Sequence, residues 1–196
     1  MKNLLTIALL FTLLSCTKNQ NPRILITTQL GDIEAEIYVD KAPVTAANFL
    51  RYVDSARYNN GLACFYRIVR QDNQPGKPIK IEVIQGGYGK DSLIGIYQFP
   101  PIKHESTKET GVLHTDGALS MARMEPGTAS SEFFICIGNQ PELDFGGKRN
   151  PDGQGFAAFG KVYKGMEVVR KIQQLKDSLQ FLENPVNIIS IKRIKN

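Results

Sequence analysis

One arginine stands inside a strongly apolar run of the sequence, where a charge is unexpected. Arg67 lies in the segment Phe65-Tyr66-Arg67-Ile68-Val69, which otherwise has the composition of a packed β-strand. A guanidinium stays protonated in proteins and offers five N–H donors in a fixed plane, so it can hold an acceptor atom in a defined position. Most arginines of this kind are charges at the edge of a sheet. Arg67 is therefore a candidate electrostatic donor, with a strand-edge charge as the alternative.

Other catalytic chemistries have weaker support in the sequence. The glycine-rich segment 85–91 lacks the spacing of a phosphate-binding loop. Neither His104 nor His114 has a cysteine or carboxylate at metal-ligand spacing, so we expect no metal site. Three serines lack the glycine-flanked turn of a hydrolase nucleophile: Ser120, Ser130 and Ser131. We therefore expect neither a nucleophile nor a cofactor.

Alternating polarity predicts the strands that would position these side chains. Apolar residues occupy every second position in 33–39, and a turn at 30–32 joins this strand to segment 23–29 as a hairpin. Further strands are predicted at residues 63–70, 80–85, 118–124, 132–137, 156–163 and 186–194. In 132–137, Phe134 and the other even-numbered residues share one face, while Phe133 and the odd-numbered residues share the other. One face would line a groove and the other the core.

Two helices are predicted from apolar residues at helical spacing. Pro43 suits a first helical turn, and the stripe that follows it is Ala46, Phe49, Leu50 and Val53. A second helix begins at Gly165 and is bounded by Pro185, with the stripe Val168, Ile172, Leu175 and Leu179. Residues 72–78, 86–108 and 144–155 have the composition of Gly/Pro-rich connections. Eight strands and two helices without βαβ alternation predict a mainly β fold, an antiparallel barrel or sandwich.

The composition places these elements in one globular domain. The chain has 196 residues, of which 22% are charged and 42% hydrophobic. This balance excludes a disordered tail, a collagen-like repeat and a multi-span membrane protein. The formal net charge is +5, but the basic residues are spread along the chain rather than gathered in a stripe. Nucleic acid is therefore not an expected partner.

The beginning of the chain resembles the export signal of a bacterial lipoprotein. Lys2 precedes an apolar run over 4–14, which has the length of a signal-peptide core and is too short for a spanning helix. The segment Leu13-Leu14-Ser15-Cys16 resembles a lipobox, in which the chain is cut before the cysteine and the cysteine carries the lipid. The alternative is an ordinary signal peptide with an incidental cysteine. The expected divisions are a signal peptide over 1–15, a lipidated tether over 16–23 and one domain over 24–196.

The other two cysteines, Cys64 and Cys136, each lie in an apolar, strand-like run. An exported protein could bridge them, but a buried free cysteine is also common as a small apolar residue. We expect two free thiols.

Most of the chain, from about Ile24 to Ile194, resembles the cyclophilin family of peptidyl-prolyl isomerases. The matching segments follow the family's order and spacing: APVTAANF at 42–49, FYR at 65–67, QGG at 85–87, GALSMAR at 117–123, SEFFI at 131–135 and FGKV at 159–162. The resemblance implies a cyclophilin-like eight-stranded antiparallel β-barrel capped by two α-helices, with the active groove on its outer face. It also implies peptidyl-prolyl cis-trans isomerase activity, which breaks no bond and needs no cofactor.

The resemblance assigns roles to residues of this groove. Arg67 would be the catalytic cation that favours a twisted, deconjugated amide over either planar form. Phe134, Val83 and Leu143 would form the pocket for the proline ring, and Gln85 would bond the peptide backbone. The full set of expected substrate-binding residues is Phe134, Gln85, Val83, Ala122, Leu143, Glu132 and Phe156.

Several of these positions depart from the family pattern. Glu82-Val83 replaces Phe-Met, Arg123 replaces Asn, Glu132 replaces Gln, Glu142 replaces Trp, and Phe156 stands for a His after an insertion around 145–155. We expect a shallower, more charged pocket, turnover slower than in typical cyclophilins and weak cyclosporin affinity. The Glu132 carboxylate is expected within reach of Arg67, where it would compete with the substrate, so that Glu132→Gln would raise kcat/KM. A clamp that holds Arg67 in place is the alternative.

These expectations describe a monomeric, lipid-anchored isomerase of the bacterial cell envelope, facing the periplasm. Its partners would be proline-containing peptides and unfolded exported proteins, and it would contact the membrane through the lipid anchor only. The alternative is a catalytically weak or inactive cyclophilin-like module that binds proline-containing segments of a partner protein. Arg67, Gln85 and Phe134 favour the enzyme, whereas Glu82, Val83 and Glu132 favour the module.

Overall fold

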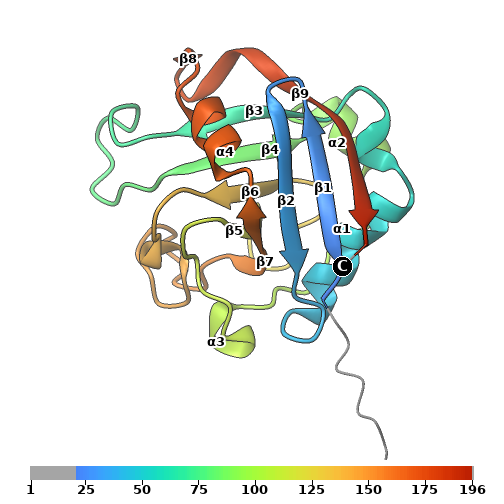
Figure 1. The fold of residues 1–196 in the computed structure, drawn as a ribbon. Helices are drawn as coiled ribbons and strands as arrows, with labels where there is room; N and C mark the ends of the chain where they lie inside the picture. The colour runs from blue at the N-terminus through green and yellow to red at the C-terminus, as the bar shows by residue number, and fades with distance from the viewer. Residues whose placement is uncertain (1–20, 196) are drawn as a thin grey trace, which may run out of the picture.

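A computed structural model describes residues 21–195 and shows a closed antiparallel β-barrel (Figure 1). Nine strands of this part of the chain pair in the order β1-β2-β7-β5-β6-β4-β3-β9-β8, and an additional pairing of β1 with β9 closes a ring of eight strands, with β8 outside it. The strands are β1 Arg23–Thr28, β2 Gly31–Ile37, β3 Cys64–Val69, β4 Val83–Gly87, β5 Ala118–Met121, β6 Phe133–Cys136, β7 Ala157–Lys164, β8 Asp177–Ser178 and β9 Phe181–Ile194. The expected mainly β barrel and its hairpin of β1 and β2 are confirmed.

The inner face of the barrel forms the hydrophobic core. Ile33, Ala35 and Ile37 of β2 are fully buried, while the residues between them are half-buried. The Phe49 ring contacts those of Phe133 and Phe159, with ring centroids 5.4 and 5.0 Å apart. Burial of this apolar surface is the main favourable contribution to folding, and it makes the barrel a firm support for side chains on its outer face.

Two helices, α1 Pro43–Asp54 and α4 Met166–Gln173, cover the barrel and lie on opposite sides of it in Figure 1. The predicted apolar stripe of α1 is buried in the core. α4 contacts β2, β3 and β4, with Val168 and Ile172 buried. Both helices therefore form because an amphipathic face has a sheet to cover.

A buried carboxylate completes the first turn of α1. Glu105 accepts hydrogen bonds from the backbone N–H groups of Val44 and Thr45, at 3.1 and 2.6 Å, and from the Thr45 hydroxyl at 2.7 Å. The first backbone N–H groups of a helix have no partner inside the helix, and the helix dipole favours a negative charge there. Glu105 therefore ties the segment before residue 107 to α1.

The two predicted capping helices, α1 and α4, are present, but the segment from residue 86 contains two further short helices where only a Gly/Pro-rich connection was expected. α2 spans Asp91–Tyr97 and α3 spans Thr107–Thr110, so the described residues form four α-helices. α2 has no fully buried residue, although Leu93, Ile94 and Tyr97 pack against the core. α3 begins with a capping box of Ser106 and Glu109, a sequence signal that the prediction overlooked. Two short 3-10 helices, η1 Arg57–Asn59 and η2 Pro141–Leu143, complete the fold.

The predicted end of the second helix is also wrong. α4 ends at Gln173, and Leu179, which was placed on its apolar stripe, is 86% exposed and lies in the turn between β8 and β9. Pro185 lies within β9 rather than at a helix boundary. The hairpin forms because Arg70 and Asn73 hold the Asp177 carboxylate, and this contact between distant segments outweighs the helical spacing of the apolar residues.

The two described cysteines are free, as predicted. Burial raises the pKa of the Cys64 thiol to about 11, and it also raises the pKa of Cys136, so neither is a reactive thiolate at neutral pH.

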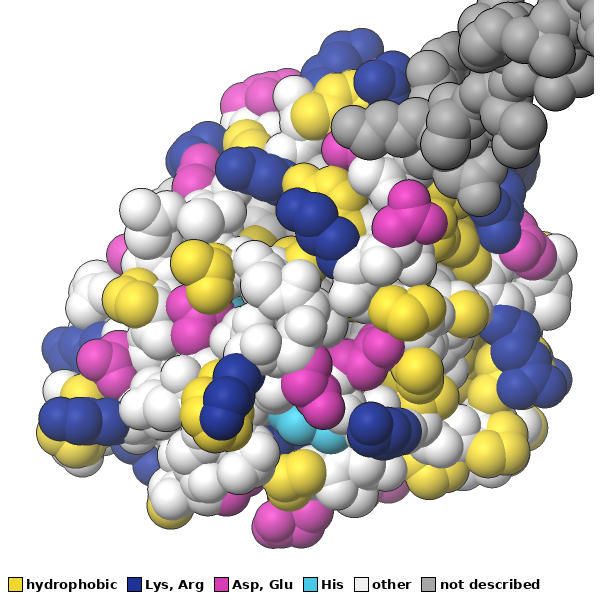
Figure 2. Space-filling model, turned by 90° about the horizontal axis from the view of Figure 1, so that it is seen from below, with side chains coloured by type: hydrophobic (Ala, Val, Ile, Leu, Met, Phe, Trp, Pro, Cys, Tyr) yellow, Lys and Arg dark blue, Asp and Glu magenta, His cyan; other side chains and the backbone are white. Residues whose placement is uncertain are grey.

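No helix of residues 21–195 is both long enough and apolar enough to span a bilayer. The signal peptide and Cys16 lie outside the described residues, and β1 begins at Arg23. On the face shown in Figure 2, acidic and basic side chains are interspersed rather than gathered in a patch of one sign.

Candidate active site

A second apolar cluster lies outside the barrel core, where β4, β5 and β6 meet η2. Its buried members are Val69, Ile81, Val83, Ala118, Phe134, Cys136 and Leu143, with Ala122 and Phe156 packed against it. The core cluster instead contains Phe133, Ile135 and Ile137. The predicted division of β6 into two faces is therefore confirmed. The structure brings together five of the substrate-binding candidates, namely Val83, Ala122, Phe134, Leu143 and Phe156.

The Phe134 ring of this cluster contacts two other rings. The Phe156 ring meets it edge-on at 90°, with ring centroids 5.4 Å apart, and the His114 ring stacks on it at 5.9 Å. His114 is fixed by contacts of its own: Nδ1 lies 2.7 Å from Asp144 Oδ1 and Nε2 lies 2.9 Å from Ser120 Oγ. Sequence reasoning considered His114 only as a metal ligand and missed this supporting role.

Arg67 lies beside the apolar cluster because of strand register. In the sheet, Arg67 of β3 is opposite Gln85 of β4, and Gln85 is opposite Phe134 of β6. The three candidate side chains thus stand on adjacent strands in one row. Residues directly opposite one another on neighbouring strands point to the same face of the sheet. This row therefore places a cation, an amide and an aromatic ring next to one another.

Two glutamine side chains hold the Arg67 guanidinium. Nη1 donates to Gln85 Oε1 at 2.8 Å, while Nε and Nη2 donate to Gln180 Oε1 at 3.1 and 2.6 Å. In residues 21–195, no ion pair joins Arg67 to a carboxylate. Burial lowers the pKa of Arg67 from its usual value, but an arginine remains charged at neutral pH. Arg67 is therefore a charged donor whose partners are neutral.

Gln85 is itself oriented by Tyr66. Its Nε2 donates to the Tyr66 hydroxyl at 2.6 Å, which turns Oε1 toward Arg67. The Tyr66 ring stacks on Phe181 of β9, with ring centroids 6.4 Å apart. The amide can therefore serve as a fixed part of the site.

The expected contact between Glu132 and Arg67 is not present, which corrects the sequence prediction. Glu132 Oε1 accepts from the Tyr88 backbone N–H at 2.8 Å and from the Ser131 hydroxyl at 3.1 Å, while Oε2 accepts from the Gly89 N–H at 3.3 Å. The loop after β4 offers unpaired backbone donors, and the carboxylate turns to them. Glu132 neither competes for Arg67 nor clamps it, so Glu132→Gln is not expected to raise kcat/KM.

We expect Glu132 to make stability depend on pH. Burial raises the pKa of its carboxyl above the usual value of 4.5, and hydrogen bonds, chiefly from Tyr88, oppose this only in part. A carboxyl with a higher pKa in the folded state binds more protons there, so the free energy of unfolding falls as pH rises from about 4.5 through the raised pKa. Glu132→Gln removes this contribution. Urea unfolding at pH values from about 4 to 7 should show that the free energy of unfolding of Glu132→Gln rises relative to that of wild type as the pH increases. A difference that stays constant over this range would contradict the raised pKa of Glu132.

The insertion around 145–155 closes one edge of the apolar cluster. Arg123 forms a bidentate pair with Asp152, at 2.8 and 3.0 Å, and its guanidinium carbon lies over the Phe156 ring, 5.2 Å from the centroid. Arg149 of the same insertion donates to the Ile79 carbonyl at 2.6 Å. Burial, and to a smaller extent the charge of Arg67, lower the pKa of Arg149.

Fold and site together define a class of protein. A closed eight-stranded antiparallel barrel carries, outside its core, an apolar cluster beside a charged donor. A family model for cyclophilin-type peptidyl-prolyl cis-trans isomerases matches residues 23–195. The chain belongs to this family, which confirms the resemblance seen in the sequence and supports peptidyl-prolyl isomerase activity.

Named relatives agree with this assignment. A peptidyl-prolyl cis-trans isomerase of Acinetobacter baylyi is 34% identical over 186 residues, covering 92% of this chain and 89% of the relative. Peptidyl-prolyl cis-trans isomerase B of Escherichia coli is 35% identical over 147 residues, covering 74% of this chain and 80% of the relative. A crystal structure of a Cryptosporidium parvum cyclophilin-type isomerase shares the fold, with a TM-score of 0.70 and 22% identity over 90% of this chain and 99% of that one.

Proposed function

We propose that this chain accelerates X–Pro isomerisation by binding the twisted amide, with the proline ring against Phe134 and the amide beside Arg67. The observation that carries the proposal is the row of Arg67, Gln85 and Phe134 on adjacent strands, because it places a charged donor next to an apolar cluster. Gln85 would bond the peptide backbone and so set which amide faces the guanidinium.

The chemistry needs no bond to break. Resonance gives amide rotation a barrier of roughly 18–20 kcal/mol, and twisting the C–N bond removes that resonance and makes the nitrogen an acceptor. A donor that bonds this nitrogen only in the twisted state lowers the barrier without tightening ground-state binding. Arg67 is held by neutral amides, so its full charge is available for this purpose.

Proline-containing peptides are the proposed substrates. The Cryptosporidium parvum isomerase has also been crystallised in the presence of the dipeptide Ala-Pro. In this chain Val83, Phe134 and Leu143 belong to the apolar cluster beside Arg67, and we propose that the proline ring packs against this cluster.

The proposed turnover is slower than that of typical cyclophilins. Arg123, at a position where the family has Asn, is engaged by Asp152 and by the Gly155 carbonyl and has a side chain only 1% exposed. Glu142, at the family's Trp position, accepts from the Lys148 backbone N–H at 2.7 Å. Both side chains bond residues of the insertion and are not available to a bound peptide, so the groove offers fewer contacts to a substrate.

A protease-coupled assay with a short Ala-Pro peptide tests the proposal. We expect acceleration of cis-to-trans conversion that is proportional to enzyme concentration, with kcat/KM below that of Escherichia coli isomerase B measured alongside. The competing binding module would bind the same peptide, detected by calorimetry, without changing the conversion rate. That result would contradict the proposed isomerase activity and favour the binding module.

We further propose that Cys16 carries a lipid anchor and that the domain acts on exported proteins in the cell envelope. The support is the lipobox-like segment Leu13-Leu14-Ser15-Cys16 after a short apolar run. A single acyl chain gives only marginal membrane binding, so stable anchoring requires more than one chain.

Cys16→Ser is expected to abolish lipid attachment and to move the protein from the membrane fraction to the soluble fraction. Ser15→Ala, which keeps a small residue before the cysteine, serves as the matched control and should remain in the membrane fraction. Mass spectrometry of the mature amino terminus shows whether the chain begins at Cys16 and whether this cysteine carries a lipid. A mature chain that begins beyond Cys16 without a lipid would refute the anchor.

A further inference from the structure

The turn between β8 and β9 has a backbone conformation that is unusual for its residues. Leu179 and Gln180 have φ angles of 52° and 76° and form a two-residue loop between Ser178 and Phe181. Turns of this kind favour Asn and Gly, because positive φ brings the Cβ of other residues too close to the backbone. Strain of this kind that persists beside a candidate active site suggests a functional role.

The side chain of Gln180 supplies a reason for the strain. Its Oε1 accepts from both Nε and Nη2 of Arg67, and its Nε2 donates to the Asn73 carbonyl at 3.1 Å. A carbonyl can only accept, so this bond orients the Gln180 amide with its oxygen toward Arg67. The backbone carbonyl of Gln180 accepts from the N–H of Ile68, the residue after Arg67, at 2.8 Å. Gln180 therefore contacts β3 through both its backbone and its side chain.

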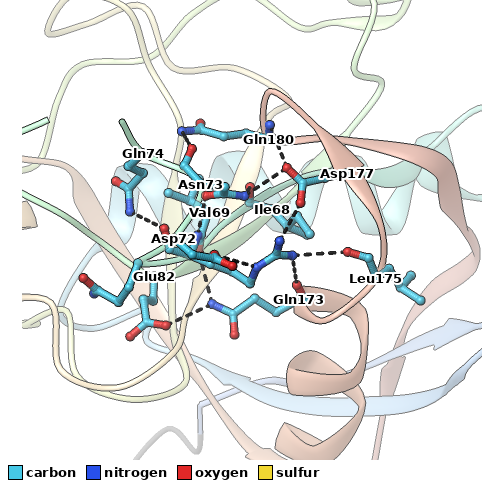
Figure 3. Close-up of polar contacts among 12 residues, drawn as sticks. Ile68, Val69, Asp72, Asn73, Gln74, Glu82, Gln173, Leu175, Asp177 and Gln180 are labelled. Carbon is cyan, nitrogen blue, oxygen red and sulfur yellow. Dashed lines mark hydrogen bonds and ion pairs between the residues drawn. The ribbon is translucent and has the colours of Figure 1, made fainter. Parts of the chain in front are cut away.

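A buried carboxylate holds the hairpin in this position, as Figure 3 shows. Asp177, whose side chain is 5% exposed, accepts from Arg70 Nη2 at 2.7 Å, from Asn73 Nδ2 at 3.1 Å and from the Gln180 backbone N–H at 2.9 Å. Arg70 in turn donates to the Gln173 carbonyl at the end of α4. The turn is thus attached to β3, to the loop after β3 and to α4.

We propose that Gln180 is a positioning residue that fixes the plane of the Arg67 guanidinium toward the pocket. The proposal rests on the proposed role of Arg67. Gln85 holds only Nη1, so without Gln180 the guanidinium could rotate about its remaining bonds. Together the two glutamines occupy three of the five N–H donors and leave one on Nη1 and one on Nη2 for the substrate. A neutral amide also leaves the charge of Arg67 uncompensated, which a carboxylate in the same place would not.

Glycine substitutions separate the positioning role from the strain. Gln180→Gly removes both the side chain and the strain, whereas Leu179→Gly, the matched control, removes only the strain of the adjacent residue. We expect Leu179→Gly to melt about 1–4 °C above wild type, whereas in Gln180→Gly the loss of three side-chain hydrogen bonds offsets the relief of strain. Only Gln180→Gly should lose activity, with kcat lowered about tenfold or more and KM little changed, because the lost contact acts on the transition state. A Gln180→Gly protein with wild-type kcat would overturn the proposal.

Two further variants make the test independent of folding and of the proposed function. Gln180→Met keeps the length of the side chain without its acceptor and should lose kcat to the same extent as Gln180→Gly. Combining Gln180→Gly with Arg67→Ala should cost nothing beyond Arg67→Ala alone, since both act through one guanidinium. Full additivity of the two losses would refute the positioning role. If Arg67→Ala itself keeps wild-type activity, the proposed function fails instead.

Discussion

Arg67→Ala is expected to lower kcat/KM for Ala-Pro peptides by about 10²–10³, the usual cost of removing an electrostatic donor from an active site. Arg67 is half-buried and lies beside an apolar pocket, where a hydrogen bond to a twisted amide is stronger than it would be in water. Within residues 21–195 the Arg67 side chain bonds Gln85 and Gln180, which its loss leaves near solvent, so we expect little change in the melting temperature.

Arg193→Ala is the matched control for the loss of one positive charge. Arg193 pairs with Asp54 on the surface, at 2.6 Å, away from the apolar cluster of the site. It should keep wild-type kcat/KM. Equal activity of Arg67→Ala and Arg193→Ala in the protease-coupled assay would show that Arg67 is a structural charge, which was the alternative drawn from the sequence.

Glu105→Ala is expected to produce a large loss of stability. It leaves two backbone N–H groups of α1 and the Thr45 hydroxyl without a partner, in a place where water has little access. Unsatisfied buried donors and a lost helix cap together cost about 2–4 kcal/mol in free energy of unfolding. For a domain of this size that lowers the melting temperature by about 5–15 °C.

Glu183→Ala controls for the removal of a carboxylate as such. Among the described residues, the Glu183 carboxylate forms an ion pair with the exposed Lys176, a contact worth about 0–1 kcal/mol. Thermal unfolding followed by circular dichroism should separate the two variants clearly. Similar melting temperatures for them would mean that Glu105 does not support α1.

The alternation of polar and apolar residues predicted a mainly β fold, a barrel or a sandwich, and the family resemblance selected the barrel. In β6 the alternation separated Phe134, in the outer cluster, from Phe133, in the core, because a strand has only two faces. The contact of Arg67 with Gln85 follows from strand register, which the sequence pattern constrains but does not specify.

Contacts between distant segments could not be predicted from the sequence. The place of Glu132 depends on backbone donors that only the folded loop after β4 presents. Gln180 bonds Arg67 although the two residues are 113 positions apart in the sequence. Arg123 and Asp152 of the insertion are 29 positions apart. No periodic pattern encodes such pairs. They depend on where the barrel brings each loop, which is set by packing rather than by local preference.

Exchange NMR of an Ala-Pro peptide with a catalytic amount of protein tests the central claim most directly, because it measures binding and isomerisation in one sample. Wild type should produce exchange between the cis and trans proline resonances within a second, whereas the uncatalysed exchange takes tens to hundreds of seconds. Arg67→Ala should still shift the peptide resonances through the apolar pocket but produce no fast exchange. Equally fast exchange with Arg67→Ala, or binding without exchange by wild type, would contradict the account.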